Sequence, residues 1–375
     1  MTTHGPRTAT IPGPRTATIP GPRTATTPGP RTATTPGPRT AATTPGPRTA
    51  ATIQEDPVHH PRTRHLISVD DLTDDDLRTL VADGVAFRAA DRKGGPKPLR
   101  DEVVGIYFSK TSTRTRTAFS SGALRLGASV ITYGPGDLQL NTGETSEDTG
   151  AVLSRMLDVL VARTAGDEAE MRAWASQRRM SVVNAMSAGE HPTQALTDLT
   201  TLSAHFGRLD GLRVLYVGEG NNSASALALA LSRFPGTELE LRTPPGYGLD
   251  PSYLARAKAH AARTGASVCE RHDMDDLPAD VDAVYTTRWQ TTGTTKPDPD
   301  WRDVFAPFQV SARLWESSPK AVFLHDLPAH RGDEVTAEVL DGPHSIAFEQ
   351  AENKMHSAMA VLKWCRAGGP PAPGE

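Results

Sequence analysis

Short apolar runs alternate with amphipathic stretches along most of this chain. The apolar runs predict buried strands, and several of the stretches between them carry apolar residues at helical spacing, as in 117–126 and 195–205. Strands that alternate with helices are typical of an α/β fold, in which parallel sheets are covered by helices. The predicted strands are 103–108, 129–133, 159–162, 182–184, 213–217, 239–242 and 283–286.

Two further helical patterns flank this region. Ser68 is a favourable N-cap, and the pattern that it opens continues to about residue 92. The other pattern covers 350–366, and we expect this last helix to pack back on the first domain.

The segment 207–211, Gly-Arg-Leu-Asp-Gly, lies between two sets of predicted strands and indicates a domain boundary. A chain of 375 residues is long enough for two domains. We therefore expect two doubly wound domains, each with a parallel sheet flanked by helices, over 64–206 and 211–345.

A low-complexity repeat occupies residues 1–57. The unit Gly-Pro-Arg-Thr-Ala-Thr begins at Gly5 and recurs with small variations up to Gly46. Glycine and proline interrupt any helix or strand ladder, and few apolar side chains are present to offset the loss of chain entropy. We expect this segment to be a disordered tail.

Composition excludes several classes of function. The formal net charge of -4 gives no support to a nucleic-acid or membrane surface, and no apolar run reaches the ~20 residues that span a bilayer. Cys269 and Cys365 are too few for a disulfide framework and lack metal-ligand spacing. We interpret them as half-buried thiols of a cytoplasmic protein.

Two short tracts carry the candidate chemistry. Residues 112–116, Ser-Thr-Arg-Thr-Arg, follow a predicted strand and precede a helix, where N–H groups, hydroxyls and a guanidinium can surround a phosphate. Residues 191–194, His-Pro-Thr-Gln, supply an imidazole and an amide that can hold and polarise a carbonyl. Taken singly, they could also be a helix cap and a buried histidine before a turn. Together they favour a phosphorylated carbonyl compound as the ligand.

These tracts and several later pieces resemble, in the same order, the aspartate and ornithine carbamoyltransferase family. The later pieces are Gln139 with 143–145 (Gly-Glu-Thr), 148–149 (Asp-Thr), Arg163, 325–328 (His-Asp-Leu-Pro) and 350–353 (Gln-Ala-Glu-Asn). The resemblance implies a carbamoyl phosphate site that needs neither a cofactor nor a metal.

The resemblance also implies a role for each matching residue. Arg163 would reach the phosphate and carbonyl oxygens, His191 and Gln194 would hold the carbamoyl end, and Leu327 would offer its backbone carbonyl. Arg114, Arg163 and His191 would stabilise the charge that develops as an amine attacks. The residues so assigned to carbamoyl phosphate are Ser112, Thr113, Arg114, Thr115, Gln139, Arg163, His191, Gln194, Leu327 and Lys354.

Two of these assignments have consequences of their own. Gln139 matches a position that the family lends to the neighbouring subunit's site, which implies a homotrimer with shared active sites. Lys354 stands where the family usually has arginine, so it keeps the charge but loses the two-pronged guanidinium.

The amine side departs from the ornithine-type pattern at Asp326, where ornithine-type members have cysteine. A carboxylate beside a dianionic phosphate is unfavourable unless a cation lies between them. We therefore hypothesise that Asp326 faces the ammonium of the incoming amine. The alternative is an aspartate that turns to solvent or pairs with Arg331.

Residues 286–293 depart from the same pattern. Ornithine-type members have an aspartate followed by Ser-Met-Gly, whereas 287–290 read Thr-Arg-Trp-Gln, closer to the Thr-Arg-x-Gln with which aspartate carbamoyltransferases meet a carboxylate. A residue at a helix N-terminus or a plain loop charge is the alternative for Arg288. Asn222 matches an asparagine that ornithine-type members place on the amino acid. The residues assigned to the amine are Asn222, Thr287, Arg288, Gln290 and Asp326.

The predicted function is transfer of a carbamoyl group from carbamoyl phosphate to a small amino acid, giving a ureido product and phosphate. The altered amine side favours a short diamino acid over plain ornithine. Three alternatives stay open: ornithine carbamoyltransferase of arginine metabolism, a non-catalytic carbamoyl-phosphate-binding paralogue, and nucleic-acid binding through the arginines of the repeat. A dinucleotide site at 218–220 is disfavoured, because Gly-Glu-Gly lacks the third glycine of that fingerprint.

Overall fold

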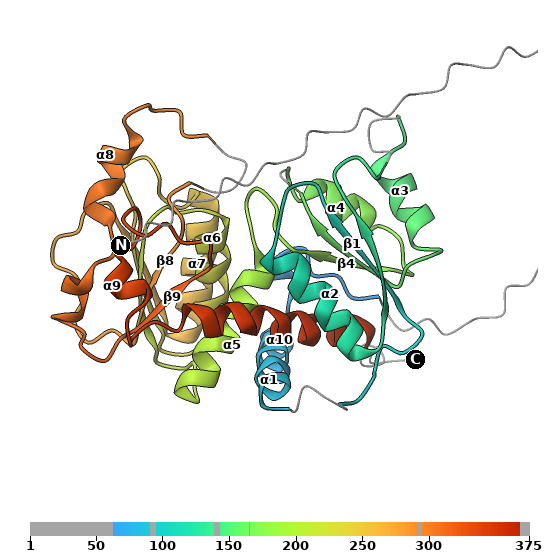
Figure 1. The fold of residues 1–375 in the computed structure, drawn as a ribbon, viewed down its shortest axis with the longest axis horizontal. Helices are drawn as coiled ribbons and strands as arrows, with labels where there is room; N and C mark the ends of the chain where they lie inside the picture. Colours follow the sequence, from blue (N-terminus) through green and yellow to red (C-terminus); the bar gives the residue numbers. More distant parts are fainter. Residues whose placement is uncertain (1–62, 91–94, 139–142, 165, 291–294, 368–375) are drawn as a thin grey trace, which may run out of the picture. The chain divides into compact units, whose positions relative to one another are not determined.

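The computed structural model describes residues 63–90, 95–138, 143–164, 166–290 and 295–367. Two parallel sheets organise these residues, with helices on both faces of each sheet (Figure 1). This architecture confirms the predicted α/β class. The predicted tail, 1–57, lies outside the described residues. Among the helices of the described ranges, none combines the length and apolar character that a membrane crossing requires.

The first sheet has the strand order β2-β1-β3-β4, with every neighbouring pair parallel. Alternate residues of β1 face opposite ways, so Ile106 packs into one apolar cluster and Tyr107 into another. The strands are β1 (Val103–Phe108), β2 (Ser129–Tyr133), β3 (Val159–Arg163) and β4 (Ser181–Asn184). The helices on one face are α3 (Ser146–Leu153) and α4 (Ala169–Trp174), and those on the other are α1 (Asp74–Ala89), α2 (Arg114–Leu126), α5 (Pro192–Phe206) and α10 (Ala347–Arg366).

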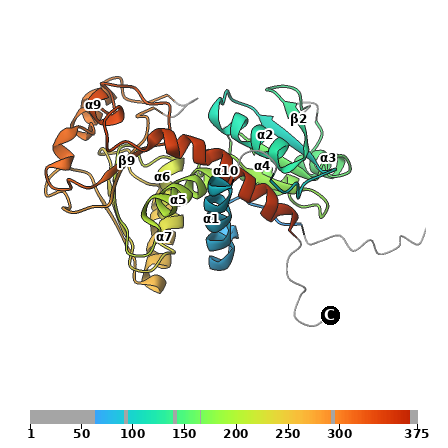
Figure 2. The same ribbon diagram turned by 60° about the horizontal axis from the view of Figure 1, so that its bottom comes forward.

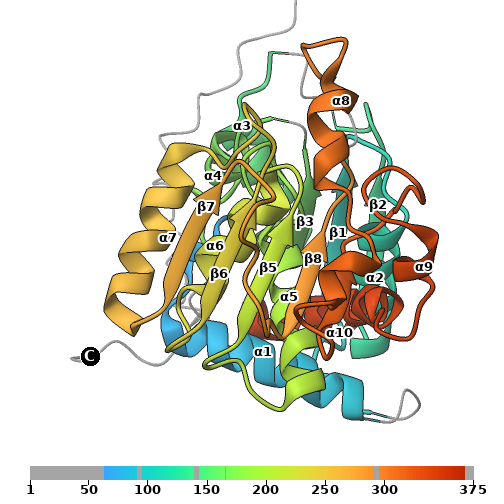
Figure 3. The same cartoon turned by 90° about the vertical axis from the view of Figure 1, so that its left-hand side faces the viewer.

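The second sheet has the order β7-β6-β5-β8-β9 and is also parallel throughout (Figure 3). Its strands are β5 (Arg213–Val217), β6 (Glu238–Arg242), β7 (Ser267–Arg271), β8 (Ala283–Thr286) and β9 (Val322–His325). Its remaining helical elements are α6 (Asn222–Leu231), α7 (Pro251–Thr264), α8 (Trp301–Phe305), α9 (Ala337–Leu340) and the 3-10 turns η2 (Ala306–Phe308) and η3 (Ala312–Trp315).

One continuous apolar cluster joins the two sheets. It includes Val104 of β1, Leu196 of α5, Leu227 of α6 and Tyr285 of β8. The last helix, α10, packs on α1, α2 and α5 and also contacts β9, so it extends along both halves (Figure 2). The two sheets are therefore held by shared helices, and their carboxyl ends face a common space.

The helix starts differ from the sequence prediction. Ser68 caps only a 3-10 turn, η1 (Val69–Asp71), and Thr73 is the N-cap of the helix that follows. Both residues form a capping box with an aspartate three positions on, so the chain contains two successive helix starts. Neither thiol is half-buried, because Cys269 is exposed and Cys365 is buried.

Gly220 lies where two backbone segments touch. A Cβ atom at this position would lie 2.3 Å from the carbonyl carbon of Gly248 and 2.3 Å from the amide nitrogen of Leu249. We expect Gly220→Ala to lower the free energy of unfolding by about 2–3 kcal/mol, since backbone atoms must move to admit the methyl group. Urea unfolding measures this change. Gly166→Ala is the control, because a Cβ there meets nothing within 4 Å; equal losses in both variants would contradict the prediction.

Candidate active site

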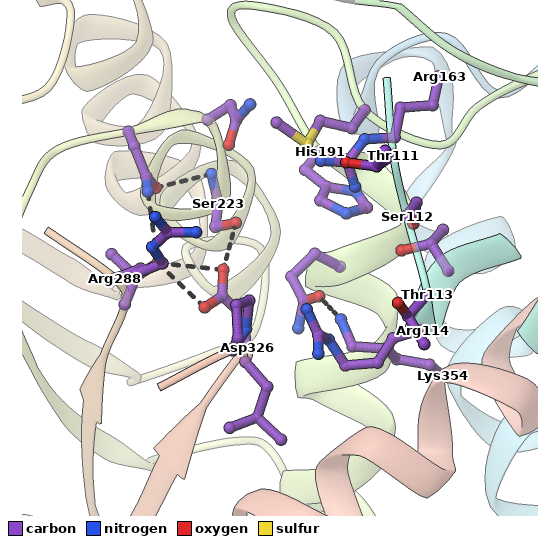
Figure 4. Close-up of a pocket in the computed structure, with 18 residues that line it drawn as sticks. Thr111, Ser112, Thr113, Arg114, Arg163, His191, Ser223, Arg288, Asp326 and Lys354 are labelled. Carbon is purple, nitrogen blue, oxygen red and sulfur yellow. Dashed lines mark hydrogen bonds between the residues drawn. The ribbon is translucent and has the colours of Figure 1, made fainter. Parts of the chain in front are cut away.

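A cavity of about 290 Å³ opens at the carboxyl ends of the strands of both sheets. The chain lines it with residues that follow β1, β4, β5, β8 and β9, and with residues of α2, α5 and α10 (Figure 4). Loops beyond the carboxyl ends of parallel strands are the usual binding edge of an open α/β sheet. The lining residues are Thr111, Ser112, Thr113, Arg114, Thr115, Arg163, Met186, His191, Gln194, Asn221, Asn222, Ser223, Thr287, Arg288, Asp326, Leu327, Pro328 and Lys354.

The first wall combines a helix N-terminus with guanidinium groups. Helix α2 begins at Arg114, and the Thr113 side chain makes no capping hydrogen bond, so the first N–H groups face the cavity without a side-chain cap. Within the described residues, Arg114 and Arg163 form no side-chain hydrogen bond or contact ion pair. Burial lowers the pKa of both guanidinium groups, and the Asp326 carboxylate acts in the opposite direction. Charged donors without protein partners favour an anionic ligand here.

His191 is buried at the start of α5 and is neutral. Its backbone N–H donates to the carbonyl of Asn222 at 3.1 Å, and its Nδ1 lies 3.2 Å from the Thr193 hydroxyl. Burial lowers the pKa of the imidazole well below its ordinary value, and the charges of Lys354 and Arg163 lower it further. A neutral ring whose Nδ1 accepts from Thr193 presents Nε2–H, which is a donor suited to a carbonyl oxygen.

A buried hydrogen-bond chain supports this wall. The Lys354 ammonium donates to Oε1 of Gln194, and Nε2 of Gln194 donates to Asp198 at 2.7 Å. Asp198 also accepts from the Gln350 amide at 2.6 Å and from the Tyr285 hydroxyl at 3.1 Å. Burial raises the pKa of Asp198 to about 7. The chain runs from the cavity to a strand of the second sheet, so it ties the two halves together behind the site.

Burial lowers the pKa of Lys354 to about 8, although Asp326 and Asp198 oppose this shift and Arg114 and Arg163 reinforce it. A lysine in its neutral form cannot pair with a phosphate, so binding above this pH requires proton uptake. We expect the affinity for carbamoyl phosphate to fall by up to about tenfold per pH unit above about pH 8.

Lys354→Arg is the matched variant for this pH dependence, because arginine stays charged throughout the range. Its affinity should stay level between pH 8 and 9.5, as measured by equilibrium binding of carbamoyl phosphate without an acceptor. Parallel pH profiles for the two proteins would show that Lys354 does not titrate in this range.

The opposite wall centres on Asp326. Its carboxylate accepts from the Ser223 hydroxyl at 2.9 Å and from the Thr287 hydroxyl at 3.0 and 3.1 Å, and it faces the cavity (Figure 4). The alternative pairing with Arg331 is wrong, because Arg331 binds Asp341 at 2.8 and 2.6 Å. The side chain is only 16% exposed, so the solvent-facing alternative is wrong as well.

The backbone at Leu327 is fixed by a buried histidine. Leu327 has a φ of 53°, and its N–H donates to Nδ1 of His325 at 2.8 Å. His325 Nε2 lies 3.2 Å from a carboxylate oxygen of Glu334, so the ring donates there and accepts from Leu327. This pair holds the left-handed Leu327 backbone at the edge of the cavity.

A possible metal-ligand cluster nearby already has protein partners. His330, Asp333 and Glu334 bring ligand atoms close together. However, Asp333 pairs with Arg302 at 2.9 Å, and one oxygen of Glu334 accepts from the His325 ring and from the backbone of His330. The cluster is therefore interpreted as part of the support for Leu327.

Comparison with known proteins agrees with both walls. The profile described as the aspartate/ornithine carbamoyltransferase carbamoyl-P binding domain matches residues 64–204, and that of the Asp/Orn binding domain matches 210–365. The chain belongs to the aspartate/ornithine carbamoyltransferase family. It is therefore a carbamoyltransferase.

Relatives and solved structures match nearly the whole of the described region. The chain is 42% identical over 299 residues to the ornithine carbamoyltransferase of Mycolicibacterium smegmatis, which covers 78% of this chain and 97% of that protein. It is 39% identical over 304 residues to that of Symbiobacterium thermophilum, with 80% and 96% covered. The Pyrococcus furiosus ornithine carbamoyltransferase structure superposes with a TM-score of 0.77 at 35% identity, covering 82% of this chain and 99% of that one.

Most residues that the sequence assigns to this carbamoyltransferase site lie together in the cavity. Gln290 is not among the lining residues, and Gln139 lies outside the described residues. The Asn222 amide lines the cavity but donates to the carbonyl of Ser187 at 2.8 Å.

Among the residues that support the site, Asp198 and Ser223 were not predicted from the sequence. Asp198 stands four positions after Gln194 on a predicted helix, so the i, i+4 spacing could have indicated it. Ser223, which binds Asp326, carries no comparable signal.

Proposed function

We propose that this carbamoyltransferase moves the carbamoyl group of carbamoyl phosphate to the side-chain amine of ornithine. The observation that carries the proposal is a single cavity with Arg114, Arg163 and a neutral His191 on one wall and Asp326 on the other. The reported relatives, at 39% and 42% identity, are named ornithine carbamoyltransferases. This favours ornithine over the shorter diamino acid that the sequence analysis preferred.

On the donor side, the proposal assigns the phosphate to residues 112–115, with the N–H groups at the start of α2. Arg163 and the Nε2–H of His191 take the carbonyl oxygen, and the carbonyl of Leu327 accepts from the carbamoyl amide. Both side-chain atoms of Gln194 already have partners, and each keeps capacity for one more hydrogen bond. Gln194 can therefore bind the carbamoyl end while its Oε1 keeps the hydrogen bond from the Lys354 ammonium.

The proposed reaction is a direct displacement. The neutral amine forms a C–N bond to the carbamoyl carbon, negative charge grows on the carbonyl oxygen, and the C–O bond to phosphate breaks. The leaving phosphate takes the proton that the new nitrogen loses. Fixed donors aimed at the developing charge contribute about 10²–10³-fold each in comparable sites, so Arg114, Arg163 and His191 supply much of the acceleration.

On the acceptor side, the proposal pairs Asp326 with the α-ammonium and Arg288 with the carboxylate. The Arg288 Nε is buried and has no partner, so a carboxylate would satisfy it. Thr287 acts through Asp326, because its hydroxyl already donates there. Asn222, which lines the cavity, completes the proposed acceptor set, and Gln290 is left out of it because it is not among the lining residues.

A second candidate acceptor is a diamino acid shorter than ornithine. Asp326 directly precedes Leu327, the residue proposed to hold the carbamoyl amide. An ammonium on Asp326 would therefore lie close to the reacting carbon, which suits a short spacing between the two amino groups. This observation keeps 2,3-diaminopropionate in the comparison below.

An acceptor panel tests the proposal. The full chain is incubated with carbamoyl phosphate and, separately, with ornithine, 2,3-diaminopropionate, lysine, aspartate and putrescine, and ureido products are measured by mass spectrometry. We expect the highest kcat/KM with ornithine. A higher value with 2,3-diaminopropionate would favour the second candidate, and phosphate release without any ureido product would reject both.

We also propose a homotrimer in which Gln139 completes the neighbouring subunit's site. Light scattering gives the assembly state. Mixing an inactive Arg163→Ala subunit with an inactive Gln139→Ala subunit should restore activity at the sites that receive both intact residues. A monomer, or no restoration after mixing, would reject shared sites.

A further inference from the structure

Most arginine side chains in the described part of the chain bind a carboxylate or another oxygen. The exceptions include isolated, exposed positions at Arg88, Arg100 and Arg313. The other exceptions occur as two clusters, and each cluster lines one cavity.

The first cluster is Arg114, Arg163 and Arg288 in the active-site cavity. In the proposed function these free guanidinium groups bind the phosphate and the carboxylate of the substrates. On the basis of that proposed function, unpaired arginines that converge on another cavity indicate another anion site.

The second cluster is Arg155, Arg178 and Arg179, which line a separate cavity of about 340 Å³. Arg155 lies between α3 and β3, and the other two lie between α4 and β4. These are the amino ends of β3 and β4, whereas the active site is at the carboxyl ends. The cavity thus lies at the opposite end of the strands of the first sheet from the active site.

The acidic groups near this cavity are already engaged. Arg366 lies 2.9 Å from Glu102 and 3.6 Å from Asp158, and Asp158 also accepts from the Val103 N–H at 2.7 Å. The two carboxylates exceed the single charge of Arg366 by one. The three free arginines carry three positive charges, and the excess carboxylate offsets one of them. Two positive charges near the cavity are therefore uncompensated, although the formal net charge of the chain is -4.

We propose that the cavity lined by Arg155, Arg178 and Arg179 binds a small anion that carries two or more phosphate groups, at a site separate from the carbamoyl phosphate site. Guanidinium groups bind phosphate oxygens in pairs, and adjacent arginines can share a multiply charged ligand. The volume lies in the range of ~300–1,000 Å³ that holds small molecules. The three arginine side chains are exposed around this cavity, and its volume favours a small phosphorylated molecule over an acidic protein surface.

Titration calorimetry with pyrophosphate tests this inference on the full chain. Because pyrophosphate can also enter the active site, we compare the wild type with Arg163→Ala and with the double variant Arg178→Ala/Arg179→Ala. We expect two classes of binding event in the wild type. Arg163→Ala should keep the remote event, and the double variant should lose it or weaken it at least tenfold while keeping its carbamoyl transfer activity.

Arg313→Ala is the charge control, since it removes one exposed, unpaired arginine that lines neither cavity. Equal weakening in Arg313→Ala and in the double variant would mean a general charge effect, and unchanged binding in the double variant would mean that the cavity does not hold the anion. An oligo-aspartate peptide is the competing ligand. Tighter binding of that peptide at the same arginines would overturn the small-phosphate proposal in favour of an acidic partner.

Discussion

Replacing Arg163 with alanine is expected to lower kcat/KM for carbamoyl phosphate by about 10³-fold. The half-buried Arg163 side chain lines the cavity without a partner among the described residues, at the carboxyl end of β3. Its charge is fixed in place before the reaction, so alanine removes both the phosphate contact and the stabilisation of the developing oxyanion. Steady-state measurement of phosphate release at saturating ornithine gives the value.

Two controls separate this effect from misfolding. Arg313→Ala removes an exposed, unpaired arginine elsewhere and should leave kcat/KM within about twofold, since surface substitutions of this kind are near neutral. Arg163→Lys keeps the charge and should recover part of the loss. If Arg163→Ala keeps more than a tenth of the wild-type kcat/KM, then Arg163 does not contact the reacting group.

Asp326→Asn is expected to lower kcat/KM for the acceptor by about 100-fold, because a charge-assisted hydrogen bond to an ammonium contributes about 1.5–3 kcal/mol. Carbamoyl phosphate should bind at least as tightly as before, since the substitution removes a negative charge from a cavity that receives a dianion. Initial rates with each substrate varied in turn separate the two effects.

Asp326→Cys tests the same site with the residue that ornithine-type members have. It should change the preference among the acceptor panel, whereas Asp341→Asn, an exposed acidic position that pairs with Arg331, should not. Weaker carbamoyl phosphate binding with unchanged acceptor kinetics in Asp326→Asn would place the carboxylate on the donor side and reject its role as the ammonium anchor.

The sequence predicted the parallel α/β architecture because strands buried on both faces read as continuous apolar runs. One of the two missed strands, β7, does not have this property. In β7 only Val268 is buried and charged residues occupy the end of the strand, as suits the edge of a sheet. Strand β9 is a buried apolar run as long as the predicted strand β8, so its pattern could have indicated it.

The site was predictable as far as its residues lie in recognisable tracts. Residues 112–115, 191–194 and 325–328 each follow or precede an element that brings them to the cavity. The partners of Asp326 were not predictable, because Ser223 and Thr287 come from different strand ends and meet only in the folded sheet. The second arginine cluster was hidden for a similar reason, since Arg155 is separated from the adjacent Arg178 and Arg179 by more than twenty positions along the chain.

The position of α10 in the sequence limits when the amino-terminal half of this protein can complete its folding. The helix follows every strand of both sheets along the chain, yet it covers α1 and α2 in the first half. While the polypeptide is being synthesised, the amino-terminal half therefore exposes an apolar face until the last helix has emerged from the ribosome. Chaperones that bind during translation should accordingly bind the exposed apolar face of α1 and α2 in preference to the carboxyl-terminal half.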